Sequence, residues 1–152
     1  MLNNNIDVRT EIDTKKIAEK LYDISKKGDV LGLSGEMGAG KTTFAKYFIQ
    51  KGSKNQNVPS PTYNLYFKYN TRKAIVYHLD AWRLEKASEL VNLGIEEFFE
   101  ESILLIEWPE NIKEILPKKM LMLKFSIENK KRNLLLSGNE IWKKRIRCKL
   151  NG

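Results

Sequence analysis

Apolar residues near the start of the chain follow the spacing of an amphipathic helix. We predict this helix from Asp13 or Thr14, either of which is a suitable N-cap, through Ser25. Its apolar face consists of Ile17, Leu21 and Ile24. The preceding segment Ile6–Thr10 is predicted to be a short edge strand.

The next apolar segment, Val30–Ser34, is short and continuous, which is typical of a buried strand. A glycine-rich turn at Gly35–Gly40 follows it, and a helix is predicted from Lys41 to about Gln50. A strand, a glycine loop and a helix therefore follow one another directly.

Two pairs of extended segments predict β-hairpins. The first pair is Tyr63–Tyr69 with Ala74–Leu79, and the second is Met120–Ile127 with Asn133–Leu136. Between the hairpins, Ser102–Glu107 is predicted to be another buried strand. The chain thus combines antiparallel pairing with α/β alternation.

Further helices are predicted around this third strand and at the end of the chain. Segments near Glu85–Leu93 and Ile95–Glu101 have helical patterns, and Pro109 suits the first turn of a short helix. The last segment is ambiguous: Asn139 is a suitable cap for a helix from Glu140, but Ile141–Lys149 also fits a strand.

Composition places the chain among soluble globular proteins. Of 152 residues, 41% are hydrophobic and 30% are charged, which excludes disordered and coiled-coil classes. Apolar runs such as Ile103–Ile106 are too short to span a bilayer, and no signal peptide is recognisable, so we expect a cytoplasmic protein. The single Cys148 cannot form an internal disulfide, which agrees with a reducing compartment.

The net charge of +8 is distributed unevenly. Residues 118–149 hold eleven Lys or Arg and two Glu, whereas residues 85–114 hold nine Glu and two Lys. These segments are either complementary docking surfaces or ordinary solvated faces, and the charge pattern alone does not separate the two interpretations.

Gly35–Thr42 matches the phosphate-loop pattern G-x-x-x-x-G-K-[ST] in its confirming context, between a buried strand and a helix. Its backbone N–H groups surround phosphate oxygens, and the helix N-terminus adds positive potential. Lys41 supplies charge to the β- and γ-phosphates, Thr42 offers a hydroxyl to Mg²⁺, and Thr43 is a candidate contact for the α-phosphate. Loop residues expected to bind nucleotide are Gly35, Glu36, Met37, Gly38, Ala39 and Gly40.

This motif predicts an α/β, three-layer P-loop NTPase fold over a single ATPase domain, residues 1–152. Its mixed sheet should have a parallel core extended by the antiparallel hairpins. Such a site also needs a carboxylate for the metal, normally at the end of a neighbouring strand. Asp80 and Glu107 both end predicted strands, and spacing does not assign the metal role to one of them.

Other polar and aromatic residues lie near these strand ends. His78 shares a strand face with Asp80, so it either reaches the site or is a hydrogen-bonded structural residue. Trp108 either lines the pocket or packs in the core. Pro59–Thr62 lies where a switch loop would approach the γ-phosphate.

Taken together, these motifs resemble the TsaE (YjeE) family, bacterial ATPases of tRNA threonylcarbamoyladenosine biosynthesis. The resemblance rests on Gly35–Thr43, Val58–Tyr63, His78–Leu84, Leu93–Glu97 and Glu107–Glu110. The chain departs from the family pattern at Pro59, Tyr63 and Trp82.

The resemblance implies roles for particular residues. Lys41 and Thr42 would bind phosphate and Mg²⁺, Glu107 would be a metal ligand, and Asp80 would support hydrolysis of ATP. Thr62 becomes a switch candidate. The resemblance also implies that Thr10 and Arg132 flank the nucleotide.

The resemblance further implies that the partners are the TsaB and TsaD proteins. TsaD transfers the threonylcarbamoyl group to adenosine 37 of tRNAs that read codons starting with A. The chain would be an ATP-driven resetting factor, with tRNA contact indirect or weak.

A small nucleotide or metabolite kinase is the main alternative. Kinases usually shield the transfer with an arginine-rich lid, and Arg83 is the one arginine near Thr62 and Asp80 in the sequence. A guanine-specific switch protein would need a carboxylate where Asn129–Arg132 ends in arginine, so ATP is favoured over GTP. An RNA-binding module would explain the basic segment but leave the phosphate loop unused.

Overall fold

The computed structural model describes residues 2–54, 57–59, 61, 66–82, 84, 88–92 and 94–149. Within these residues the strands are β1 (Leu2–Asp7), β2 (Val30–Ser34), β3 (Tyr66–Asn70), β4 (Ile75–Asp80), β5 (Ser102–Glu107), β6 (Leu121–Glu128) and β7 (Lys131–Gly138). The helices are α1 (Glu11–Ile24), α2 (Lys41–Gly52), α3 (Ser88–Val91) and α4 (Glu140–Lys149), with 3₁₀ helices η1 (Ile95–Phe98) and η2 (Pro109–Ile115).

The described strands form one sheet in the order β1-β7-β6-β2-β5-β4-β3. β6, β2, β5 and β4 are mutually parallel, whereas β3 pairs antiparallel with β4, and β7 pairs antiparallel with β6 and β1. The sheet is therefore mixed, with a parallel core extended by antiparallel strands at both edges, as the sequence predicts.

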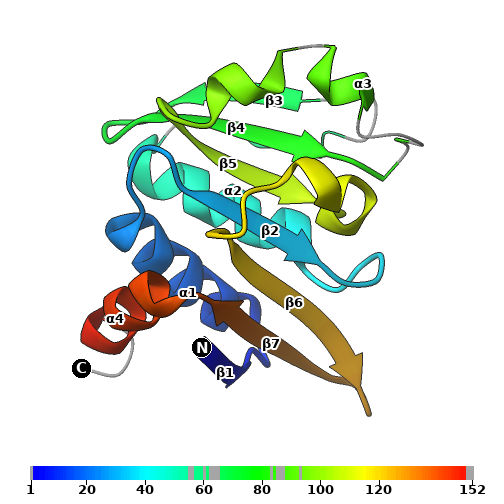
Figure 1. Cartoon of the computed structure of the whole chain (residues 1–152). Coiled ribbons are helices and arrows are strands. Elements are labelled where there is room, and N and C mark those ends of the chain that lie inside the picture. The colour runs from blue at the N-terminus through cyan, green and yellow to red at the C-terminus, as the bar shows by residue number, and fades with distance from the viewer. Residues whose placement is uncertain are drawn as a thin grey trace.

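Helices cover both faces of the sheet (Figure 1). α1, α2 and α4 pack on one face against buried residues such as Leu31, Leu33 and Leu105. α3, η1 and η2 pack on the other face, where Leu104 and Ile106 are buried. Because successive strand residues point to opposite faces, the apolar runs of β2 and β5 are buried on both sides. The fold is a three-layer α/β arrangement.

The N-cap of α1 differs from the prediction. Thr10, not Asp13 or Thr14, caps the helix: its hydroxyl accepts from the Asp13 N–H at 3.2 Å, and the Asp13 carboxylate accepts from the Thr10 N–H at 3.0 Å. This reciprocal capping box uses Asp13 as the third helical residue, so the helix begins at Glu11 and its cap lies three residues before Asp13 and four before Thr14. The edge strand β1 likewise ends at Asp7 and not at Thr10.

Other predicted elements are present with altered limits. α3 and η1 occupy part of the predicted helical segments 85–93 and 95–101, of which residues 85–87 and 93 lie outside the described part. The C-terminal ambiguity resolves to a helix, because Asn139 Oδ1 accepts from the Trp142 N–H at 3.2 Å and caps α4. The β6–β7 hairpin turns at Asn129 and Lys130, which both have positive φ.

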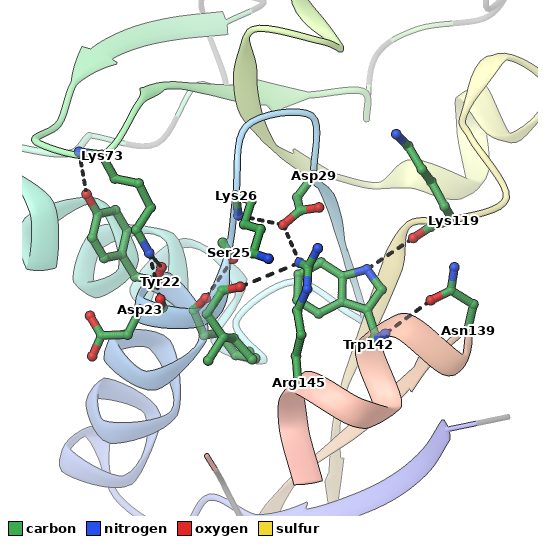
Figure 2. Close-up of polar contacts among 12 residues, drawn as sticks. Tyr22, Asp23, Ser25, Lys26, Asp29, Lys73, Lys119, Asn139, Trp142 and Arg145 are labelled. Atoms are coloured by element: carbon green, nitrogen blue, oxygen red, sulfur yellow. Dashed lines mark hydrogen bonds and ion pairs between the residues drawn. The ribbon is translucent and has the colours of Figure 1, made fainter. Parts of the chain in front are cut away.

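The C-terminal end of α1 is neutralised by side chains from distant elements (Figure 2). The last turn of α1 contains no basic residue, but Lys73 Nζ donates to the carbonyls of Tyr22 at 2.6 Å and Asp23 at 2.7 Å. Arg145 of α4 stacks on Trp142 and binds Asp29 Oδ2 at 2.6 Å. Lys73 thus complements the negative end of the helix dipole, and Arg145, within the basic segment, has a structural role through Asp29 and Trp142.

Among the described residues, none of the helices has the length and apolar character needed to cross a membrane.

Candidate nucleotide-binding site

The phosphate loop lies at the carboxyl end of the parallel strands, where β2 gives way to α2. Gly35 has φ +135°, and a side chain there would collide with the carbonyl oxygen of Phe125 in β6. Glycine is therefore required both by its backbone conformation and by the close approach of β6. The loop tip is open to solvent, because Glu36, Met37 and Gly38 are exposed.

A cavity of about 340 Å³ opens beside this loop. Most of the site residues predicted from the sequence meet there. Its lining consists of Met37, Gly38, Gly40, Lys41, Thr42, Thr43, Asp80, Trp82, Glu107, Trp108 and Arg132. Four elements distant in the sequence thus contribute to one concave surface.

The sheet register brings the two predicted carboxylates to one edge. Asp80 and Glu107 end the adjacent parallel strands β4 and β5 and are direct register partners. Because paired residues of parallel strands project to the same side, both side chains lie on the face that carries α2. They therefore approach the start of α2, where Thr42 lies.

Glu107 contacts the phosphate-loop threonine. Thr42 Oγ1 is 3.1 Å from Glu107 Oε1 and 3.3 Å from Oε2, and the carboxylate accepts this hydrogen bond. On its other side Glu107 Oε2 lies 2.6 Å from His78 Nε2. Asp80 has a different partner, because its Oδ1 accepts from the backbone N–H of Trp82 at 2.9 Å. The two carboxylates are thus in distinct environments.

Lys41 is buried at the centre of the site. Its ammonium lies 3.7 Å from the centre of the Trp108 ring and donates to the Gly35 carbonyl. Burial lowers the pKa of Lys41 below its usual 10.5, and the nearby carboxylates, Glu107 first, partly oppose this. A desolvated ammonium at a helix N-terminus is well suited to receive a phosphate group.

Burial also alters Asp80. It raises the pKa of this carboxyl above 3.8, the Trp82 N–H lowers it, and the Glu107 charge raises it further. Trp108 adopts a left-handed conformation with φ 60° and ψ 50°, which is uncommon for a bulky residue, and its N–H donates to Leu33 in β2 at 3.1 Å. Perturbed groups and an unusual backbone thus cluster in one cavity, as functional sites often show.

Several predicted residues do not line the cavity. Thr10 caps α1 and does not line the cavity, and neither do Gly35, Glu36 and Ala39. His78 lies behind Glu107, buried and hydrogen-bonded, so it contacts the site carboxylate without reaching the cavity. Trp108 lines the cavity. Thr62 and Arg83 lie outside the described residues.

Sequence reasoning assigned no role to Trp82, which lines the cavity and is 43% exposed. An aromatic residue two positions after a strand-end carboxylate is the signal that could have indicated it.

The mixed sheet, the loop between β2 and α2 and the strand-end carboxylates define a P-loop protein. Residues 8–134 match the family model for threonylcarbamoyl adenosine biosynthesis protein TsaE, and the chain belongs to this family.

Individual relatives agree with that assignment. The tRNA threonylcarbamoyladenosine biosynthesis protein TsaE of Bacillus subtilis is 40% identical over 73% of this chain and 70% of its own length. The proteins of that name from Haemophilus influenzae and Rickettsia felis are 38% and 37% identical, over 80% and 82% of this chain and 78% and 74% of their own lengths. The crystal structure of Bacillus subtilis YdiB superposes with a TM-score of 0.81 at 27% identity, covering 95% of this chain and 92% of that one.

Proposed function

We propose that the chain binds and hydrolyses Mg-ATP in support of threonylcarbamoyladenosine formation at position 37 of tRNA. The observation that carries this proposal is the meeting of Lys41, Thr42 and Glu107 in one cavity at the phosphate loop. Membership of the TsaE family supplies the biosynthetic setting. The proposal places the protein in the cytoplasm, where tRNA is modified.

The phosphate loop and α2 would bind the nucleotide phosphates. Lys41 would exchange the Trp108 ring and the Gly35 carbonyl for β- and γ-phosphate oxygens. The backbone N–H groups at the start of α2 would contribute further hydrogen bonds. Arg132, which lines the same cavity from β7, is a candidate for additional contact with the nucleotide.

The residues near Thr42 fit a magnesium ion. A hydroxyl and a carboxylate are hard oxygen donors, and adjacent ligands of octahedral Mg²⁺ lie about 2.9 Å apart when each bond is about 2.0–2.1 Å. Thr42 Oγ1 and Glu107 Oε1 are 3.1 Å apart, close to that spacing. Among the described residues, no group of three or more His, Cys, Asp or Glu is arranged to hold a metal ion by itself, so phosphate and water would complete the ligand set.

This arrangement favours a division of roles between the carboxylates. Glu107 faces Thr42 and would hold the metal ion, which would neutralise charge that develops on the phosphates. Asp80 accepts instead from the Trp82 backbone N–H at 2.9 Å, and it would orient a water molecule and accept its proton as ATP and water become ADP and phosphate. Burial, which raises the pKa of Asp80, makes it a better proton acceptor.

We further propose that hydrolysis is slow in the isolated protein and is stimulated by TsaB and TsaD. Asp80 and Trp82 both line the cavity, Asp80 is partly exposed and Trp82 is 43% exposed, so a partner that covers them would exclude and orient water. In this account the protein is a resetting factor for the transferase, and contact with tRNA is indirect or weak.

Calorimetric titration tests the nucleotide site. We expect the wild-type protein to bind Mg-ATP, to bind ATP more weakly in EDTA, and to prefer ATP over GTP. Lys41→Ala should weaken binding by about 100-fold or more, because charged hydrogen bonds to phosphate are lost. Lys46→Ala is the matched control, since Lys46 lies on the same helix but pairs with Glu11 at 3.7 Å. Normal Mg-ATP binding by Lys41→Ala would refute the site assignment.

A further inference from the structure

The single histidine of the chain lies in the sheet interior, directly behind the proposed metal ligand. The His78 side chain is fully buried in β4, which is flanked by β5 and β3. Its register partner in β5 is Leu105, two residues before Glu107. Since residues two apart on a strand share a face, His78 and Glu107 project to the same side of the sheet.

His78 and Thr42 hold the Glu107 carboxylate from two directions. His78 Nε2 is 2.6 Å from Oε2, whereas Thr42 Oγ1 lies nearer to Oε1, at 3.1 Å, than to Oε2, at 3.3 Å. Glu107 itself is only 4% exposed, so water has little access to compete for these oxygens. The orientation of the carboxylate plane is therefore determined by two protein groups.

The chemistry of the pair identifies the donor. The metal role proposed for Glu107 requires its ionised form, which only accepts hydrogen bonds, so in this role the proton of the contact is on Nε2. The other ring nitrogen, Nδ1, is buried and lacks a hydrogen-bond partner among the described residues. A buried nitrogen without a partner costs stability, and an apolar side chain would fill the same space without that cost. What an imidazole adds at this position is the Nε2–H bond to Glu107.

We propose that His78 is a positioning residue that binds Glu107 Oε2 and thereby presents Oε1 to the magnesium ion beside Thr42. This inference rests on the proposed function for its metal ion. Groups that hydrogen-bond to a metal-binding carboxylate fix its orientation, and their loss typically weakens metal affinity or activity by about 10–100-fold.

Because the chain has one histidine, its imidazole resonances need no site-by-site assignment. In protein labelled with ¹⁵N-histidine, we expect one protonated ring nitrogen, Nε2, whose proton is shifted downfield and protected from exchange, and one unprotonated nitrogen. Glu107→Gln should move the Nε2–H signal upfield, whereas Asp80→Asn should leave it nearly in place. The proposal would be overturned if Nδ1 carried the proton, or if Glu107→Gln left the chemical shift of the Nε2–H signal unchanged. Neither outcome depends on activity.

Three substitutions test the consequence for the metal. His78→Leu removes the donor, His78→Gln offers an amide N–H near the Nε2 position, and His78→Asn is too short to do so. The readout is the Mg²⁺ concentration for half-maximal binding of a non-hydrolysable ATP analogue. We expect this concentration to rise about 10–100-fold in His78→Leu and His78→Asn and to recover largely in His78→Gln. Nucleotide affinity in EDTA should change little in His78→Leu.

The controls separate this inference from the proposed function. If the wild-type protein requires Mg²⁺ and His78→Leu has the same requirement, the positioning role is refuted while the proposed function stands. If wild-type binding is independent of Mg²⁺, the proposed function itself is refuted. Should His78→Leu not fold, the comparison of His78→Gln with His78→Asn decides, because equal Mg²⁺ requirements in these two variants would overturn the positioning role.

Discussion

The Lys41 ammonium lies 3.7 Å from the centre of the Trp108 ring, so the lysine of the phosphate loop contacts the residue that follows Glu107, the proposed metal ligand, in sequence. An aromatic face stabilises a cation without neutralising it, which keeps the ammonium available for phosphate. The Lys41 ammonium is also buried at this position, and burial lowers its pKa below 10.5. The contact therefore has a consequence for the pH dependence of nucleotide binding.

We predict that Mg-ATP affinity falls with rising pH from a point below 10.5. Only the charged form of Lys41 attracts phosphate, so affinity is full below its pKa in the free protein and is lost as pH rises through that value. The measurement is calorimetric titration between about pH 8 and 10, where ATP itself no longer titrates. Lys41→Arg should bind more weakly but show little decline, because guanidinium stays charged. Parallel declines in both proteins would contradict the role of Lys41.

The ionised Asp80 carboxylate should lower the free energy of unfolding, although the proposed hydrolysis requires it. Burial raises the pKa of Asp80, so the folded state disfavours the ionised carboxyl, and this destabilisation develops as pH rises through its folded pKa. We expect Asp80→Asn to be more stable than wild type at pH 7, with the difference disappearing below the unfolded-state pKa. Turnover should fall about 10²–10⁴-fold if Asp80 is the base. Urea unfolding at several pH values and phosphate release measure the two effects, and lower stability of Asp80→Asn at pH 7 would contradict the assignment.

The glycines of the loop should differ in their tolerance of a side chain. Gly35→Ala should destabilise the fold by about 3 kcal/mol or more, because strain at φ +135° adds to collision with the Phe125 carbonyl. Gly38 has φ +82° with open space around its Cβ position, so Gly38→Ala should cost about 1–2 kcal/mol. Chemical denaturation compares the two variants, and equal losses would show that contact with β6 is unimportant.

The contacts of Arg145 with Asp29 and Trp142 should contribute to stability without affecting nucleotide binding (Figure 2). Arg145→Ala removes the stacking on Trp142 and the ion pair to Asp29. The Arg145 side chain is 20% exposed and the Asp29 side chain is 13% exposed. We expect a loss of about 1–3 kcal/mol, since the partly buried Asp29 is left without its charged partner. Arg147→Ala on the exposed side of α4 is the control and should cost little. An equal effect of both substitutions would argue against a specific role for Arg145.

The core of the fold could be predicted because its signals are local. The apolar runs Val30–Ser34 and Ser102–Glu107 form strands with those limits, and the glycine loop between β2 and α2 has its predicted place. Helix ends were harder, because the cap of α1 depends on a reciprocal pair of side chains. The choice of Thr10 over Asp13 or Thr14 requires seeing both hydrogen bonds together.

The site also has features that local sequence predicts and features that only the tertiary structure reveals. The phosphate loop could be recognised from spacing alone, whereas the separate environments of Asp80 and Glu107 depend on tertiary contacts with Trp82, Thr42 and His78. The sequence placed His78 on the face of Asp80 but could not reveal that its partner is Glu107, because that contact joins different strands 29 residues apart. Strand register, which a single sequence does not specify, supplied the missing information.

Phosphate release from Mg-ATP, measured with the purified protein alone and with TsaB and TsaD, the proposed partners, tests the central claim most directly. We predict slow release by the protein alone, stimulation by the pair, and loss of both activities in Lys41→Ala. Absence of stimulation, with ATP consumed only when a small-molecule phosphate acceptor is added, would contradict the account and indicate a kinase.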